Sequence, residues 1–328
     1  MELTTPIDFP KPHFTFSYRQ PILLMGSCFA DAVGERMKQQ RFPVDVNPFG
    51  TLYNPASVAR GLRRLLAPKP YEADELFEQE GLFHSFDHHS RFSKGSAEEC
   101  LKEMNENLSR SADFLSQASR LVITFGTAWV FRLKGKENRI VSNCHKLPAD
   151  LFIRERMDVD SIVSLWTETL TALWEKYPDV KVLCTVSPIR HLADGAHGNQ
   201  LSKSTLLLAT DMIIKTFPER TDYFPAFELF MDELRDYRFY AADMVHPSAL
   251  AADYVWERFA AHYLDKESGE LLTEIQEIGK ALAHRPFHPE SEAYKKFMFQ
   301  TMLKIKSIQD KFPYFDLSNE MNAVKKKL

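Results

Sequence analysis

The sequence has few cysteines, and their spacing does not suggest a metal site or a disulfide framework. The 328 residues include four cysteines, Cys28, Cys100, Cys144 and Cys184, which are far apart and form no C-x-x-C pair. Zinc ribbons and small disulfide-rich domains both need closely spaced cysteines. We therefore expect reduced thiols in or near the core and no metal.

A long apolar run and an excess of one charge are also missing. No apolar stretch approaches the roughly 20 residues that span a bilayer. Residues 1–16 contain Asp8 and three prolines and look like neither a secretory signal nor a transit peptide. The net charge of −4 and the pI near 6.3 favour neither nucleic acid nor an anionic membrane as a partner. The expectation is a cytoplasmic protein with no membrane span.

Strand-like and helix-like patterns alternate along most of the chain. Short apolar runs predict strands, and longer amphipathic stretches between them predict helices. This alternation favours an α/β fold with three layers, in which helices cover both faces of a parallel sheet. Expected strands are 23–25, 42–46, 120–125, 180–186 and 223–227; expected helices are 28–40, 97–117, 158–175, 200–216 and 248–262, with another opening at Asn54.

Two regions depart from that alternation. Residues 70–95 suggest a β-ribbon or irregular insertion, and 129–141 suggest a hairpin with its turn at 135–138. After residue 264 two helical stretches, 269–283 and 290–310, follow each other without a strand. The chain is therefore divided into a main domain, 1–264, and a C-terminal helical extension, 265–328. The extension packs on the main domain or on a partner chain, which makes it a candidate homo-oligomer contact.

The first strand ends at Gly26-Ser27, and a helical pattern starts at once. A serine at such a corner lies at the carboxyl edge of the sheet, where its hydroxyl can act as a nucleophile. Its N–H is one of the unpaired amides of the helix start, which can stabilise a negative charge. The other interpretation is structural, because serine is a common N-cap and glycine permits the tight turn.

A second stretch, Asp243-Met244-Val245-His246, precedes the helix at 248. With this spacing a turn can place the Asp243 carboxylate behind the imidazole of His246. The carboxylate would then fix the tautomer, and Nε2 would be free to take a proton from a serine. Taken alone, the pair is more typical of a surface contact or a helix cap.

The order of these two stretches is that of serine hydrolases with Ser, Gly, Asn and His blocks (the SGNH or GDSL type). Residues 26–30, Gly-Ser-Cys-Phe-Ala, read as the signature of the GSCFA family, which the sequence resembles from about residue 21 to 260. The resemblance implies an SGNH-hydrolase-like, flavodoxin-like fold. Further matching pieces are Asn47-Pro48-Phe49-Gly50, Thr124-Phe125-Gly126-Thr127, Asn143-Cys144-His145-Lys146 and Ser187-Pro188-Ile189-Arg190-His191.

The resemblance also implies a role for individual residues. Ser27 would be the nucleophile, His246 the general base and Asp243 the residue that orients it. The amides of Ser27 and Gly50 would form the oxyanion hole. The Asn of the usual Gly-x-Asn-Asp turn is missing from Gly126-Thr127-Ala128-Trp129, so Thr127 or Asn143 would have to replace it. One lost donor is worth about 3 kcal/mol in such sites.

Polar residues after the strands give candidate substrate contacts. In an open parallel sheet, ligands bind outside the carboxyl ends of the strands. Together with Asn199 and Lys203, the six candidates named below would form a polar, basic rim that favours hydroxyls or a carboxylate over a long acyl chain. The alternative for each is a solvated loop charge or a cap. The candidates are Asn47, Gly126, His145, Lys146, Arg190 and His191.

Two competing chemistries are weaker. Cys144 has His145 beside it, but neighbouring side chains on a strand point to opposite faces, and Cys28 is expected to pack inward. His84, His88 and His89 lack a companion carboxylate at ligand spacing.

Two classes of function remain open. The first is a serine esterase that removes an O-acyl group, such as an acetyl group, from a small or carbohydrate-like substrate without a cofactor. An acyltransferase with the same triad is a close variant of it. The second is a non-catalytic binding protein that keeps the fold. The missing block Asn favours this second class, whereas the complete set of Ser27, Asp243 and His246 favours the enzyme, which we prefer.

Overall fold

We describe the fold from a computed structural model, which describes residues 5–135 and 139–328. The expected hairpin turn at 135–138 therefore lies mostly outside the described residues. The chain forms two compact units, residues 5–15 with 20–263 and residues 16–19 with 264–328. No helix in the described part of the chain is long and apolar enough to cross a membrane.

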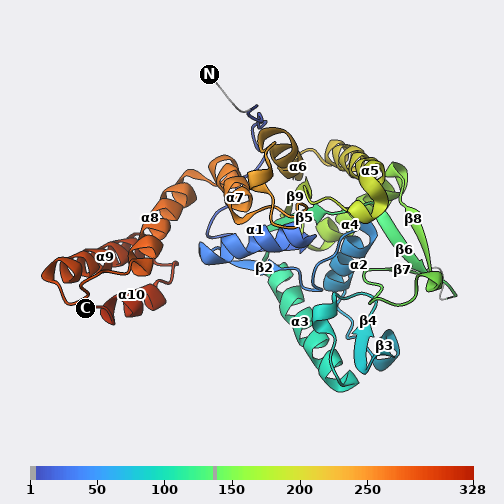
Figure 1. Ribbon diagram of the computed structural model, residues 1–328, viewed down its shortest axis with the longest axis horizontal. Helices are drawn as coiled ribbons and strands as arrows, with labels where there is room; N and C mark the ends of the chain where they lie inside the picture. Colours follow the sequence, from blue (N-terminus) through green and yellow to red (C-terminus); the bar gives the residue numbers. More distant parts are fainter. Residues whose placement is uncertain (1–4, 136–138) are drawn as a thin grey trace. The chain divides into compact units, whose positions relative to one another are not determined.

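The core of the first unit is a five-stranded parallel sheet (Figure 1). Its spatial order is β10-β9-β5-β1-β2, which is the order 2-1-3-4-5 of flavodoxin-like folds when the strands are counted along the chain. The predicted α/β class is confirmed. The five strands are β1 (Ile22–Gly26), β2 (Val44–Val46), β5 (Arg120–Phe125), β9 (Lys181–Val186) and β10 (Thr221–Tyr223).

Helices cover both faces of this sheet because alternate residues of a strand point to opposite sides. Leu24, Val122 and Leu183 face the apolar side chains of α1 and α7. Leu23, Leu121 and Val182 belong to the larger core with the opposite helices. The helices of this unit are α1 (Cys28–Gln39), α2 (Pro55–Leu66), α3 (Ala97–Gln117), α4 (Val159–Lys176), α5 (Gly195–Thr216), α6 (Ala226–Glu228) and α7 (Ala249–Tyr263), with short turns at Ala73–Glu75, Ser90–Phe92, Ala149–Leu151, Leu192–Asp194, Leu229–Glu233 and Tyr237–Phe239.

Two small antiparallel sheets are inserted between the parallel strands. Residues 70–95 contain the ribbon of β3 (Leu76–Gln79) and β4 (Leu82–Ser85). The region after β5 forms a sheet of order β7-β6-β8 from Trp129–Leu133, Ile140–Val141 and Phe152–Arg156. Sequence analysis missed β8, whose residues are mostly exposed and charged. The last strand was expected at 223–227 and begins two residues earlier, because Pro225 and the start of α6 end β10 at Tyr223.

The second unit consists of three helices, α8 (Lys266–Ala283), α9 (Glu292–Lys311) and α10 (Ser318–Lys325). They contact one another through buried residues such as Ile275, Met298 and Val324. The C-terminal helices that sequence analysis expected are present, with α10 in addition. Residues 16–19 belong to this unit, and the Tyr18 N–H donates to Ser268 Oγ at 3.2 Å.

The turn after β1 depends on Gly26. Its φ of +139° is a conformation that residues with a side chain rarely adopt, and a Cβ there would lie 2.1 Å from the Thr124 carbonyl oxygen. We expect Gly26→Ala to lower the free energy of unfolding by about 3 kcal/mol or more, measured by urea denaturation. Gly95→Ala is the control, because no atom lies within 4 Å of its added Cβ. A change in Gly26→Ala as small as in the control would contradict this account of the turn.

Candidate active site

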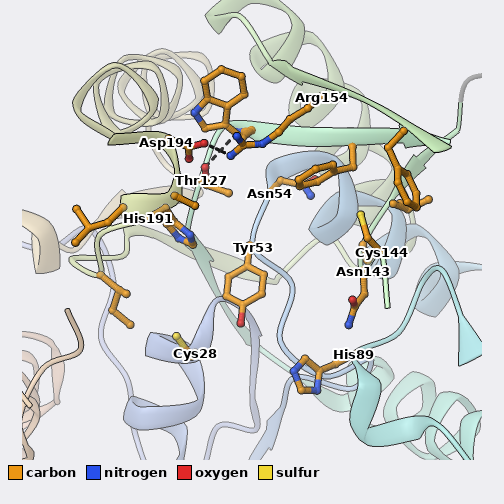
Figure 2. A pocket seen from close by; sticks show the side chains of 18 of the residues that line it. Cys28, Tyr53, Asn54, His89, Thr127, Asn143, Cys144, Arg154, His191 and Asp194 are labelled. Atoms are coloured by element: carbon orange, nitrogen blue, oxygen red, sulfur yellow. Dashed lines mark hydrogen bonds and ion pairs between the residues drawn. The ribbon is translucent and has the colours of Figure 1, made fainter. Parts of the chain in front are cut away.

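A cavity of about 690 Å³ lies in the first unit, where β1, β5 and β9 end (Figure 2). The strand order reverses between β1 and β5, and flavodoxin-like folds bind ligands beside such a point. Aromatic and aliphatic side chains from β6, β7 and β8 form one wall, and polar groups from the loops form the others. The lining includes Cys28, Tyr53, Asn54, His89, Thr127, Trp129, Phe131, Asn143, Cys144, Phe152, Arg154, Arg190, His191, Asp194 and His246.

The expected pair of Asp243 and His246 is formed, and His246 lines the cavity. His246 Nδ1 and Asp243 Oδ2 are 2.6 Å apart, while Oδ1 accepts the N–H groups of Val245 and His246 at 2.9 Å each. These backbone N–H groups and the imidazole lower the pKa of Asp243 to about 2. The carboxylate therefore stays ionised near neutral pH, and Nδ1 can carry the proton that leaves Nε2 free as a base.

The structure does not bring Ser27 to the cavity. Ser27 is only 1% exposed and is absent from the lining. Its Oγ accepts the Phe29 N–H at 3.3 Å as the N-cap of α1, and its own N–H donates to the Thr124 carbonyl at 3.1 Å. In this structure Ser27 therefore acts as a helix cap. Its N–H is occupied by the Thr124 carbonyl and is not available as an oxyanion donor.

The other expected oxyanion donors have different positions. The Gly50 N–H donates to the Asn47 carbonyl at 2.8 Å, so it too is occupied. Thr127 lines the cavity, with its Oγ1 3.0 Å from Ser202 Oγ. Asn143 also lines the cavity, and its Oδ1 accepts the His145 N–H at 2.8 Å.

Four of the six expected substrate contacts are not in the lining of the cavity. Asn47 is buried and holds the turn together, because it accepts the Gly26 N–H and donates to Asp31, both at 2.8 Å. Gly126 packs against Ser27 and Tyr53. His145 and Lys146 have positive φ angles of 49° and 60°, and this turn directs His145 inward to the Ser85 carbonyl at 2.8 Å.

Arg190 and His191 do line the cavity. Burial, assisted by the nearby Lys203 and His246, lowers the pKa of His191 to about 4. The imidazole is therefore neutral at physiological pH and can donate or accept a hydrogen bond, but it adds no positive charge. The expected basic rim is thus less basic than the sequence suggested, and Asn199 and Lys203 are both buried below it.

The expectation that Cys28 packs inward is wrong, because Cys28 lines the cavity. Sequence reasoning also missed Tyr53, Asn54 and His89 as lining residues. Figure 2 shows Cys28, Tyr53 and His89 in the same part of the cavity. For Tyr53 and Asn54 the available signal was their position just after the Asn47–Gly50 loop, since Asn54 caps a helix that starts at the carboxyl edge of the sheet. His89 comes from the 70–95 insertion, and its N–H donates to the Phe49 carbonyl at 2.9 Å, a contact that the sequence does not signal. Within the described ranges, no group of three or more His, Cys, Asp or Glu side chains could hold a metal.

Lys203 of α5 is fully buried beneath these loops. Its Nζ donates to the carbonyl oxygens of Gly126 at 2.5 Å and Ser187 at 2.7 Å, which joins the ends of β5 and β9. Among the described residues no carboxylate pairs with it, and burial lowers the pKa of its ammonium from 10.5 to about 7. Keeping Lys203 protonated in the folded protein therefore lowers the free energy of unfolding, and replacing Lys203 should change how that free energy depends on pH.

Between pH 7 and about 10, folded Lys203 binds fewer protons than unfolded Lys203. Its contribution to stability therefore rises with pH in this window, by up to about 1.4 kcal/mol per pH unit. We expect this component of the pH slope to disappear in Lys203→Met, as measured by urea unfolding at pH 7 and pH 9.5. Lys215→Met, on the exposed side of the same helix, should keep the wild-type slope. Equal slopes in wild type and Lys203→Met would contradict the shifted pKa.

The fold and the cavity define an α/β protein with a parallel sheet and a paired histidine and aspartate at its carboxyl edge. Three solved structures are similar to this chain. An acetyl esterase mutant with acetate ion has 11% identity and a TM-score of 0.37, with 79% of this chain and 99% of that chain covered. A carbohydrate esterase family 3 protein from Talaromyces cellulolyticus has 11% identity, a TM-score of 0.35 and the same coverage. An acetyl xylan esterase from Butyrivibrio proteoclasticus has 12% identity and a TM-score of 0.39, with 74% and 62% covered.

The chain belongs to the GSCFA family, whose model matches residues 21–259. A second model, described as the C-terminal domain of GSCFA domain proteins, matches residues 275–328. None of the curated proteins matches the chain. The resemblance drawn from residues 26–30 and the pieces that follow them is thereby confirmed.

Proposed function

We propose that this protein is a hydrolase of carboxylic esters, which removes a short O-acyl group from a small or carbohydrate-like substrate. The observation that carries the proposal is the hydrogen-bonded pair of Asp243 and His246 at the wall of a cavity of about 690 Å³. A carboxylate bonded to Nδ1 is the arrangement that makes an imidazole a general base in acyl transfer. The Ser27–Cys28 corner at the start of α1 supplies the nucleophile.

The size and lining of the cavity support the choice of substrate. Its volume falls in the range of sites for small molecules, about 300–1,000 Å³. Trp129, Phe131 and Phe152 give it an apolar wall, while Asn143 and His191 offer neutral hydrogen-bonding groups. A compact substrate with hydroxyl groups and a short acyl chain fits such a mixed surface better than a long acyl chain does.

A panel of esters tests this proposal. Acetyl, butyryl and octanoyl esters of p-nitrophenol and acetylated monosaccharides are offered to the wild-type protein, and release of acid is measured. We expect hydrolysis that is fastest for acetyl and falls with chain length. If acid release slows because the acyl group moves to an added alcohol, the same site works as an acyltransferase.

The second candidate is binding without catalysis. The specific observation in its favour is that the N–H groups of Ser27 and Gly50 are both already hydrogen-bonded. This reading predicts that the panel gives no hydrolysis above the buffer rate, while acetylated sugars still raise the melting temperature of the protein. That result would overturn the proposed hydrolase.

A further inference from the structure

The side chain that reaches the cavity from the corner after β1 belongs to Cys28, one residue beyond Ser27. Ser27 is covered by Gly126, since a Cβ on Gly126 would lie 3.2 Å from the Cβ of Ser27. We propose that the Cys28 thiol, in place of the Ser27 hydroxyl, is the nucleophile of the acyl transfer. This inference rests on the proposed function and specifies its attacking atom.

The backbone at this helix start favours Cys28 as well. The Ser27 N–H is occupied by Thr124, and the Phe29 and Ala30 N–H groups point back to Ser27. No hydrogen bond to another residue is described for the Cys28 N–H. An attacking atom at Cys28 would therefore have a helix-terminal amide of its own residue beside it, where a developing oxyanion can be stabilised.

A second, independent group in the cavity points to a ligand. Asn54 is 5% exposed, and its Oδ1 is used to cap α2 by accepting the Ser57 N–H at 2.8 Å. Its Nδ2 has no hydrogen bond in the described part of the chain, although the residue lines the cavity (Figure 2). An amide N–H at a cavity wall that has no acceptor in the protein can donate to a ligand bound there. Asn54 thus offers the amide that the Gly126–Thr127 turn lacks.

The charges around Cys28 explain why the thiol needs a base. Burial raises the pKa of the thiol to about 11, and Asp31 acts in the same direction. The N–H groups at the helix start and the Lys203 ammonium oppose this rise without cancelling it. Cys28 is therefore a neutral thiol near pH 7 and becomes a good nucleophile only when a base removes its proton during attack. His246 is the base that lines the same cavity with a carboxylate behind it.

The reaction then balances with water as the only co-substrate. His246 Nε2 takes the thiol proton while Sγ bonds to the acyl carbon of the ester. The tetrahedral intermediate collapses, and the alcohol leaves with the proton from His246, which leaves a thioester on Cys28. Water next gives a proton to His246 and adds to the thioester carbon. Sγ departs and regains the proton, and the carboxylic acid is released.

The test is to trap the acyl group and find where it sits. Wild type, Ser27→Ala, Cys28→Ala and Cys28→Ser are mixed with p-nitrophenyl acetate, quenched in acid and digested with trypsin, and peptide 20–36 is examined by mass spectrometry. We expect an acetyl group on Cys28 in wild type and Ser27→Ala, released by neutral hydroxylamine as a thioester is. Cys28→Ala should show no adduct, and its kcat should be lower than that of wild type by about 10³-fold or more.

Two controls keep the result specific. Cys144 also lines the cavity, so Cys144→Ala should still be acetylated on Cys28. Cys28→Ser keeps the size of the side chain, and its adduct should resist neutral hydroxylamine. An adduct on Ser27 that survives in Cys28→Ala would overturn this inference and leave the proposed hydrolase standing. Absence of any ester hydrolysis by the wild type would instead overturn the proposed function itself, and this inference with it.

Discussion

Replacing His246 by alanine is expected to lower kcat for ester hydrolysis by about 10³-fold to 10⁴-fold. The imidazole is the only base in the described lining of the cavity that has a carboxylate hydrogen-bonded to its ring. Without it, the nucleophile loses the carboxylate-supported base that takes its proton and returns it to the leaving alcohol. The measurement is kcat and KM with an acetyl ester, together with the circular dichroism of both proteins.

KM should change much less than kcat, because His246 transfers a proton in the transition state and contributes little to binding the substrate. His197→Ala is the matched control, since His197 is an exposed histidine of α5 outside the lining. A kcat of His246→Ala within about threefold of the wild-type value would be close to experimental error. That result would show that His246 does not take part in the reaction.

Asp243→Asn is expected to lower kcat by about 10²-fold to 10³-fold. The carboxylate accepts from Nδ1 of His246 at 2.6 Å and from two backbone N–H groups at 2.9 Å. An amide in its place presents hydrogens to Nδ1, which favours the tautomer with the proton on Nε2 and so blocks the base. The loss is expected to be smaller than for His246→Ala because both side chains of the pair are about half exposed, and water can replace part of the contact.

The pH profile separates this effect from unfolding. The pKa of Asp243 is held at about 2, so the carboxylate remains ionised throughout the range in which the wild type is assayed. The loss of kcat in Asp243→Asn should therefore be present at every pH between about 5 and 8, which is the range in which histidine side chains usually titrate. A loss that appears at only one end of that range would show that Asp243 acts through another titrating group. Asp253→Asn, which removes an exposed partner of Arg36, is the control.

Much of the fold could be predicted from the sequence because its core strands are unbroken apolar runs. Arg120–Phe125 and Lys181–Val186 are buried on both faces, and such strands stand out against the amphipathic helices between them. Phe152–Arg156 was missed because only its first residue is buried, so neither periodicity is visible. Ser318–Lys325 is short and follows a proline-containing turn, which hides its one buried residue, Val324.

The candidate site was predicted at the level of segments more than of side chains. The corner after β1 and the Asp243–His246 turn were both located, and the hydrogen bond between Asp243 and His246 formed as their spacing suggested. Which residue of the corner faces the cavity depends on the φ of Gly26, and no sequence periodicity reports that angle. The positive φ angles of His145 and Lys146 turn the chain after Asn143 in the same unpredictable way. The motifs therefore located the segments of the candidate site, while the direction of each side chain depends on turn geometry.

Pre-steady-state release of p-nitrophenol from p-nitrophenyl acetate tests the central claim most directly. If the cavity beside His246 performs acyl transfer through an enzyme-bound intermediate, wild type should release a rapid burst that approaches one equivalent per chain before slower turnover. The burst should be absent in His246→Ala, whereas His197→Ala should give it in full. A wild-type trace that follows the buffer rate from the first time point, or an undiminished burst in His246→Ala, would contradict the account.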